Sequence, residues 1–411
     1  MTKPSGPIPP YYCANAEGVL LAGGAPVDTL LPSPEQTPIF IYDFNIIEQR
    51  ISDLRTAMPA SLGIHYAIKA NSHAGLLARM AGKVDGFDVA SGGELAMALK
   101  AGMAANDISF AGPGKRDAEL EAAIVAGATL NLESESEADR ALAIAERLGT
   151  RARLAVRVNP DFDLKGSGMR MGGGAKPFGV DASRVPALCK TIIASGADWR
   201  GLHIFAGSQS LDSGAIIETQ GQTLALAQQI ADEVDAAPPL VNLGGGFGVP
   251  YFAGDAPVDI GAIGAALGAH PLYAAMEAAG TRFAIELGRW LVAEAGIYVT
   301  RIIDKKVSHG ETFLVTDGGL HHQLAASGNF GTVVRRNYPI AITGKFGAKP
   351  DGDVHVVGCL CTPLDKLGDQ VALPAADVGD LVVIFLAGAY GRSASPSAFL
   401  GHPPAAELLI G

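Results

Sequence analysis

The chain has 411 residues, of which 48% are hydrophobic, enough for more than one packed core. It carries 42 acidic and 31 basic residues for a net charge of −11, and the absence of a basic stripe argues against a nucleic-acid partner. The proline-rich N-terminus lacks an apolar signal core, and no apolar stretch is long enough to cross a bilayer. We therefore expect a cytoplasmic protein with no membrane association.

From about residue 38, strand-like and helix-like segments alternate along the sequence. Strands are expected at 38–44, 63–70, 86–91, 108–112, 129–134, 152–160, 200–208, 240–246 and 282–288. Helices are expected at 45–58, 74–81, 92–102, 118–127, 135–149, 185–195, 221–234 and 272–280. Eight or nine such steps over about 250 residues are typical of a (β/α)8 TIM barrel, which we place at 38–295. A doubly wound open sheet is the alternative.

After residue 295 the pattern changes to strands with little helix between them. Strand-like runs lie at 297–307, 312–319, 338–343, 353–361, 380–386 and 406–411. They predict a β-sandwich or β-barrel domain formed by residues 296–411, to which residues 1–37 add a strand or two, so the domain is discontinuous.

Four cysteines are present, and two of them form a C-x-C pair near the C-terminus. They are Cys13, Cys189, Cys359 and Cys361. Four are too few for a disulfide scaffold, and no metal-ligand set surrounds them in the sequence, so no metal is expected.

Polar residues recur where the expected barrel strands end, which in a TIM barrel is the face that carries the active site. They are Lys69, Asp88, Arg157, Ser208, Gly244 to Gly246 and Glu286. Lys69 ends an apolar run, and desolvation there would lower the pKa of its amine. A lysine that snorkels from an edge strand is the alternative interpretation.

The three glycines can wrap a phosphate with free backbone N–H groups, although such a run is more often a simple turn. They lack the spacing of a dinucleotide fold or a Walker loop. Ser208 can add a hydroxyl to the same phosphate. A lysine, a phosphate cradle and a buried acid together indicate pyridoxal 5'-phosphate (PLP): Lys69 forms the Schiff base, and Glu286 keeps the pyridine nitrogen protonated.

Nine motifs now support a resemblance to a known family. They are YAIKAN, FDVASGGEL, VRVNP, FAGSQ, LGGGFGVPY, ELGR, TDGG, CLCTPLD and AGAYG, in that order, between residues 38 and 395. The chain resembles the fold-type III PLP-dependent decarboxylases, among them the diaminopimelate and ornithine decarboxylases. The resemblance implies an amino-acid decarboxylase that works as a homodimer with shared active sites.

The same resemblance implies roles for individual residues. Lys69 is similar to the Schiff-base lysine and Glu286 to the partner of the pyridine nitrogen. Asp88 and Arg157 match positions that support the lysine and the ring. The phosphate and substrate contacts implied are Ser208, Gly245, Gly246, Arg289 and Tyr390. Cys361 and Asp365 match a motif that reaches the partner's site, where the cysteine returns a proton to the decarboxylated carbon.

Three departures from the family pattern concern the ring and the substrate. Phe205 stands where a histidine usually stacks on the pyridine ring, which leaves His203 a smaller expected role. Thr362 follows Cys361 where the family has an acid for a distal ammonium. Ala325 and Asn329 stand where diaminopimelate decarboxylases have an arginine and a tyrosine for the distal carboxylate.

These departures predict a substrate that is not dibasic. The glycine-rich insert 168–179 and the CTPLD motif resemble a branch that decarboxylates a glutamyl group bound to an acyl-carrier protein. The alternatives are a true meso-diaminopimelate decarboxylase, an amino-acid racemase and an inactive decarboxylase-like binding protein.

Overall fold

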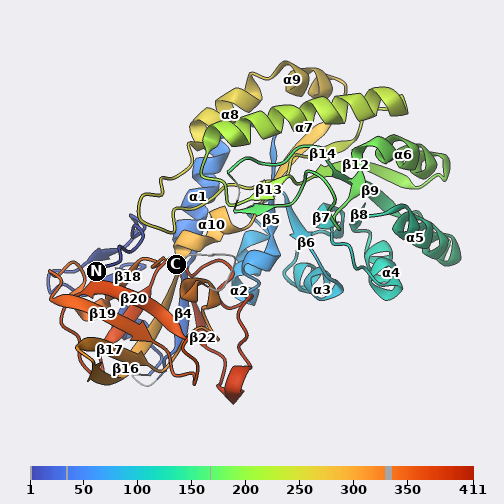
Figure 1. The fold of residues 1–411 in the computed structure, drawn as a ribbon. Helices are drawn as coiled ribbons and strands as arrows, with labels where there is room; N and C mark the ends of the chain where they lie inside the picture. Colours follow the sequence, from blue (N-terminus) through green and yellow to red (C-terminus); the bar gives the residue numbers. More distant parts are fainter. Residues whose placement is uncertain (1, 34–35, 167, 329–335) are drawn as a thin grey trace. The chain divides into compact units, whose positions relative to one another are not determined.

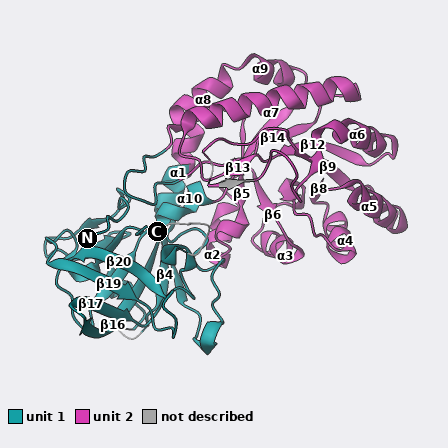
Figure 2. Cartoon of the chain, in the orientation of Figure 1, with its two compact units in different colours: residues 1–50, 249–257, 289–411 teal, residues 51–248, 258–288 magenta. Residues whose placement is uncertain are grey.

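The computed structural model describes residues 2–33, 36–166, 168–328 and 336–411. The chain divides into two compact units (Figure 2). The barrel unit comprises residues 51–248 and 258–288, and the sheet unit comprises residues 1–50, 249–257 and 289–411. Within the described ranges, none of the helices combines the length and the apolar character needed to span a bilayer.

Over its described residues, the barrel unit has eight parallel strands in the order β9-β12-β14-β15-β5-β6-β7-β8, and β8 pairs with β9 to close the ring (Figure 1). The strands are β5 (Gly63–Ala67), β6 (Gly86–Val89), β7 (Ile108–Phe110), β8 (Thr129–Leu132), β9 (Arg153–Asn159), β12 (Asp198–Ile204), β14 (Leu240–Asn242) and β15 (Arg282–Leu287). Most of their side chains are buried, because the barrel interior and the helices cover opposite faces of each strand. The unit has three further short strands, β10 (Met169–Arg170), β11 (Val180–Asp181) and β13 (Gly207–Ser208). Strand β11 pairs with β9, and β10 pairs with β13.

Helices follow most of the barrel strands. They are α2 (Ala74–Met80), α3 (Gly92–Lys100), α4 (Asp117–Ala126), α5 (Glu135–Leu148), α6 (Val185–Ala194), α7 (Ser213–Val234), α8 (Ile260–Gly268) and α9 (Pro271–Ala278). Helix α5 shows why the boundaries fall where they do. The Ser134 hydroxyl accepts the Glu137 N–H at its start, and Gly149 ends it with a φ of 61°. The unit boundary falls within α1 (Phe44–Ala57), and the short α10 (Arg289–Val292) belongs to the sheet unit.

The sheet unit is built on a mixed sheet in which β18, β21, β16, β17, β19 and β20 are neighbours in that order, while β4 pairs with β16 and β22. The strands are β4 (Ile39–Asp43), β16 (Gly296–Ser308), β17 (Glu311–Thr316), β18 (Ile340–Ile342), β19 (Gly352–Val357), β20 (Lys366–Leu373), β21 (Leu381–Ile384) and β22 (Ala406–Ile410). A separate three-stranded sheet holds β1 (Cys13–Ala14), β2 (Leu20–Ala22) and β3 (Ala25–Pro26).

The predicted fold class, a TIM barrel with a discontinuous β domain, is confirmed. The units differ from the predicted boundaries at three places, because residues 38–50, 249–257 and 289–295 belong to the sheet unit. Strand β4, expected at the start of the barrel, pairs with β16 and β22. All five residues of β4 are buried, so its sequence has the continuous apolar character of a barrel strand.

Candidate active site

Lys69 lies directly beyond a barrel strand, as the sequence predicted. It belongs to a single 3-10 turn (Ile68–Ala70) that follows β5. Its neighbours Ile68 and Ala70 are buried, but Lys69 itself is exposed. The expected desolvation of the amine is therefore not found. The two buried neighbours instead fix the backbone of the turn that carries Lys69.

Phe205 follows β12 at the same end of the barrel. The Nζ atom of Lys69 lies 5.9 Å from the centre of the Phe205 ring, which is the outer limit of a cation–π contact. Phe205 is half-buried. An aromatic ligand held by Lys69 would meet a phenyl ring that can stack but cannot donate a hydrogen bond.

Glu286, near the end of β15, is buried and held by two neighbouring strands. The His203 Nε2 lies 2.7 Å from the Glu286 Oε2, and the Asn242 Nδ2 donates to the same oxygen at 3.2 Å. The backbone register explains this meeting, since His203 on β12 pairs with Asn242 on β14. Within the described residues no hydrogen bond reaches the other oxygen, Oε1.

The surroundings of Glu286 keep its carboxylate ionised. Burial would raise the pKa of Glu286, but the charge and hydrogen bond of His203, with smaller contributions from Lys69 and Arg157, lower the pKa to about 2. His203 therefore has a larger role than the sequence predicted. Its ring holds one carboxylate oxygen, and the ionised group can accept a hydrogen bond from a protonated pyridine nitrogen.

Asp88, on β6, is buried, and no described residue lies within normal hydrogen-bond distance of its carboxylate oxygens. His65, on the adjacent strand β5, places its Nδ1 3.6 Å from the Asp88 Oδ1. Burial lowers the pKa of His65, but the charge and hydrogen bonding of Asp88 outweigh it, and the net pKa is raised. Buried carboxylates normally have hydrogen-bond partners, so these oxygens are suited to a ligand.

Arg157, on β9, is held by an acid that sequence reasoning missed. Its Nη1 lies 2.7 Å from the Oε1 of Glu133, and both side chains are buried. Glu133 also accepts the N–H groups of Gly112 and Gly179 at 2.6 and 2.7 Å. Burial would raise the pKa of Glu133, but Arg157 and these N–H groups lower it. Glu133 follows β8 within the run TLNLES, so its strand-end position was the available signal.

The glycine turn after β14 requires glycine for reasons of packing. Gly244 and Gly246 have φ of 70° and 86°, and a Cβ at Gly245 would overlap the backbone oxygen of Glu286. The Asn242 side chain accepts the Gly244 N–H at 2.9 Å. Ser208, in β13, is half-buried within the same unit. The turn therefore packs its backbone directly against the strand that carries Glu286.

The barrel-unit residues fit PLP in three respects. Lys69 offers an exposed side chain beside an aromatic ring, Glu286 offers an ionised carboxylate with one open oxygen, and Asp88 offers a buried carboxylate whose ion pair with His65 is 3.6 Å long. Lys69 and Glu286 would hold the aldehyde and the ring nitrogen of that cofactor.

In the sheet unit, Arg289 lies among tyrosines. Its Nη1 donates to the Tyr251 hydroxyl at 2.9 Å, and its guanidinium carbon lies 4.6 Å from the centre of the Tyr390 ring. Tyr390 has a φ of 58°, an unusual conformation for an aromatic residue that tends to mark functional sites. Arg289 and Tyr390 were both predicted from the sequence, and the structure brings them together.

The loop that carries Cys361 is also in the sheet unit. Cys361 is exposed and Thr362 is half-buried, whereas Asp365 is only 2% exposed. The Asp365 carboxylate accepts the N–H groups of Leu320 and Leu360 at 2.6 and 2.8 Å. Within its own subunit, Asp365 therefore anchors the loop.

Of the positions expected at the distal carboxylate, Ala325 is half-buried in a 3-10 turn and Asn329 lies outside the described residues. Arg336, exposed, stacks its guanidinium 3.8 Å above the Phe252 ring.

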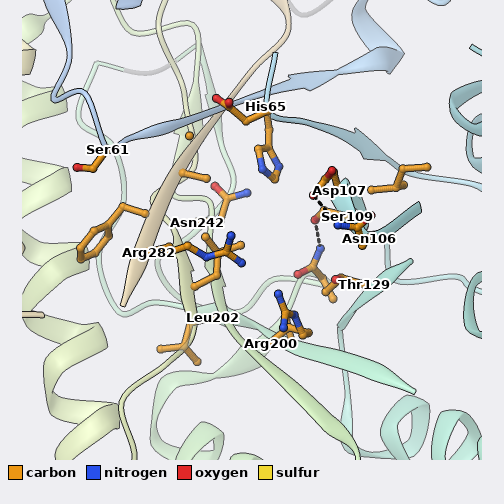
Figure 3. A pocket seen from close by; sticks show the side chains of 18 residues that line it. Ser61, His65, Asn106, Asp107, Ser109, Thr129, Arg200, Leu202, Asn242 and Arg282 are labelled. Carbon is orange, nitrogen blue, oxygen red and sulfur yellow. Dashed lines mark hydrogen bonds between the residues drawn. The ribbon is translucent and has the colours of Figure 1, made fainter. Parts of the chain in front are cut away.

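A cavity of about 230 Å³ lies at the opposite end of the barrel, where the strands begin (Figure 3). Gly63, Ile108, Thr129, Leu240 and Arg282, the first residues of five strands, line it. Active sites of TIM barrels lie at the carboxyl ends of the strands, so we assign this cavity to the barrel floor.

Known decarboxylases resemble this chain over most of its length. The family model for the pyridoxal-binding domain of pyridoxal-dependent decarboxylases matches residues 45–293. L-glutamyl-[BtrI acyl-carrier protein] decarboxylase of Niallia circulans is 38% identical over 93% of this chain and 90% of its own. A Staphylococcus aureus relative, 2-[(L-alanin-3-ylcarbamoyl)methyl]-2-hydroxybutanedioate decarboxylase, is 31% identical over 89% of this chain and 92% of its own.

The crystal structure of diaminopimelate decarboxylase from Helicobacter pylori complexed with L-lysine superimposes with a TM-score of 0.81 at 28% identity, covering 92% of each chain. The curated relatives are decarboxylases, which favours decarboxylation over racemisation. The chain therefore belongs to the pyridoxal-dependent decarboxylases, and it is a carboxy-lyase that uses pyridoxal 5'-phosphate.

Proposed function

We propose that this decarboxylase removes the α-carboxylate of an amino acid whose far end carries no free ammonium group. An aminoacyl group bound to an acyl-carrier protein is the leading substrate class. The observation that carries the proposal is that Asp365, the acid in the Cys361 loop, uses its carboxylate oxygens to accept backbone N–H groups.

Asp365 is the one acidic residue in the run 359–366, and both of its oxygens accept backbone N–H groups. Thr362, at the position where the family places an acid, has no charge, and its hydroxyl accepts the Leu364 N–H at 3.4 Å. A distal ammonium buried against this loop would lack a counter-ion, at a cost of several kcal/mol. A neutral or acyl-linked far end avoids that cost.

Two relatives support the same substrate class. Both of their named substrates contain an amino acid joined to a larger group, a carrier protein in one and a hydroxybutanedioate in the other. Decarboxylation of such a substrate requires that both its α-amino group and its α-carboxylate be free. The larger group then replaces the distal ammonium of a dibasic amino acid.

We assign the following roles to the barrel-unit residues. Lys69 would hold the aldehyde carbon of the cofactor, and Glu286, oriented by His203, would keep the ring nitrogen protonated. Phe205 would stack on the ring. PLP, when bound, supplies an electron sink for the pair left at Cα after loss of CO2.

The other predicted site residues keep their proposed roles. Ser208, Gly245, Gly246 and Arg289 are proposed phosphate contacts, and Arg289 and Tyr390 also bind substrate. Cys361 is the proposed proton donor to the decarboxylated carbon.

We also propose a homodimer, in which Cys361 serves the partner's site, and a cytoplasmic location. The exposure of Cys361 supports the first, because an exposed side chain is accessible to a second subunit. All four cysteines are free, which is the usual state in a reducing compartment.

The test is a CO2-release screen of the purified holoenzyme with free amino acids, meso-diaminopimelate among them, and with glutamyl and other aminoacyl groups on an acyl-carrier protein. We expect the highest kcat/KM for a substrate without a distal ammonium. Rapid release from free meso-diaminopimelate, with none from any carrier-bound substrate, would overturn the proposal.

A matched pair of variants tests the reason for this preference. Thr362→Glu places a carboxylate in the Cys361 loop, and Thr362→Gln adds a side chain of the same size without charge. We expect only Thr362→Glu to raise the relative kcat/KM for diaminopimelate, by about tenfold for each 1.4 kcal/mol of new ion pairing. Equal effects of the two variants would show that charge at this loop does not select the substrate.

A further inference from the structure

Three side chains with metal-binding atoms meet in the sheet unit. His321, Cys359 and His402 place their ligand atoms within 4.8 Å of one another. The Cys359 Sγ lies 3.9 and 3.8 Å from the two ring nitrogens of His402. The three residues follow β17, follow β19 and precede β22, so the cluster joins three segments that are far apart in the sequence.

His321 differs from its neighbours in its hydrogen bonding. His321 is 0% exposed, and both of its ring nitrogens are unpartnered among the described residues. The adjacent His322 is the internal comparison. Its Nδ1 lies 3.0 Å from the Tyr298 hydroxyl and its Nε2 lies 2.9 Å from the Pro403 oxygen. Since buried ring nitrogens are normally satisfied, the cluster itself should supply a partner for His321.

Hydrogen bonds around the cluster hold its three segments in place. Asp365 accepts the N–H groups of Leu320 and Leu360, the residues next to His321 and Cys359. The contact between His322 and Pro403 holds the segment of His402 in the same way. The cluster is therefore part of an ordered, cross-linked region of the sheet unit.

We propose that His321, Cys359 and His402 bind a divalent transition-metal cation, and that Zn²⁺ fits best. Zinc takes cysteine sulfur and histidine nitrogen in tetrahedral geometry, with bonds of about 2.0–2.3 Å that place the ligand atoms about 3.3–3.6 Å apart. The Cys359–His402 separations are already close to that spacing. Cys359 and His402 are only partly buried, so water can take the fourth position.

Binding requires each histidine to offer the lone pair of a neutral ring nitrogen. The metal–sulfur bond forms as the thiol proton of Cys359 leaves to solvent.

The experiment uses the full-length holoenzyme, freed of metal by a chelator and titrated with zinc. We expect one equivalent to bind, with one sulfur and two imidazole nitrogens in the zinc X-ray absorption spectrum. Zinc should also raise the midpoint of thermal unfolding, because it binds the folded chain. Cys359→Ser and His402→Asn should weaken zinc binding by at least about 100-fold and abolish that rise.

The chain offers a matched control for each change. Cys361→Ser alters the other cysteine of the C-x-C pair, and His309→Asn alters an exposed histidine of the sheet unit. Both should bind zinc as the unaltered protein does. Failure to bind one equivalent, unchanged binding by Cys359→Ser and His402→Asn, or a spectrum without sulfur would each overturn the proposal. Because the variants at Cys359 and His402 alter partly buried side chains, circular dichroism first checks that they fold.

Discussion

Replacing His203 by leucine should change the contribution of the Glu286 carboxylate to the free energy of unfolding from stabilising to destabilising. The pKa of Glu286 falls from the ordinary 4.5 to about 2, although burial alone would raise it. At about 1.4 kcal/mol per pKa unit, this fall corresponds to about 3 kcal/mol in favour of the charged carboxylate. Breaking a buried ion pair typically costs about 3–5 kcal/mol, which is consistent with that value.

The sign of the pH dependence follows from the direction of this pKa. Because the folded-state pKa is lowered, the wild-type carboxylate stabilises the fold at every pH above about 4.5 and loses that contribution as the pH falls towards 2. Without His203, burial dominates and the pKa of Glu286 rises above 4.5. The carboxyl group of His203→Leu then destabilises the fold increasingly as the pH rises above about 5.

The measurement is the urea midpoint of the apo-protein at several values between about pH 5 and about pH 8. We expect His203→Leu to lose about 3 kcal/mol at the upper end and less at the lower end. His203→Gln is the matched control, because it keeps a donor for the Oε2 of Glu286 without the charge. Its urea midpoint should lie between those of the wild type and His203→Leu. Identical pH profiles for His203→Leu and the wild type would refute the reasoning.

Four further changes test the site. Lys69→Ala should abolish both turnover and the covalent, borohydride-trappable attachment of the cofactor, measured by mass spectrometry; a trapped adduct on another lysine would contradict the assignment. Glu286→Gln should retain PLP but lose most of kcat, about 100-fold or more, because the amide cannot keep the ring nitrogen protonated; wild-type kcat in this variant would exclude that role. Cys361→Ala should slow proton return and increase by-products in a product assay, whereas a wild-type product ratio would argue against the shared-site dimer. Asp365→Asn leaves one of two buried N–H groups without an acceptor and should lower the unfolding free energy by about 1–3 kcal/mol, and an unchanged urea midpoint would show that the loop does not depend on this anchor.

The barrel and the positions of its strand-end residues were predictable because the alternation of strand and helix is local. Lys69 and Glu286 fall at strand ends whatever the exact register. The role of His203 was not predictable, since it depends on the registers that align β12 with β14 and β14 with β15. Strand β4 has the apolar sequence of a barrel strand, and only its partners show where it belongs.

The proposed metal-binding cluster could not be predicted from the sequence for a similar reason. No short spacing connects His321, Cys359 and His402, so the cysteines gave no metal signal in the sequence. The exposure of Lys69 was also missed, because an apolar run shows which neighbours are buried but not whether the side chain between them is.

The pairing of β4 has a consequence for the order in which the protein folds during synthesis. Every strand of the barrel has been translated by residue 287, so the ring can close while later residues are still in the ribosome. Strand β4, translated before all of them, pairs with β16 and with β22 at residues 406–410. The edge of β4 that pairs with β22 therefore stays unpaired until the end of the chain has been synthesised. During that time it can pair with strands of other chains.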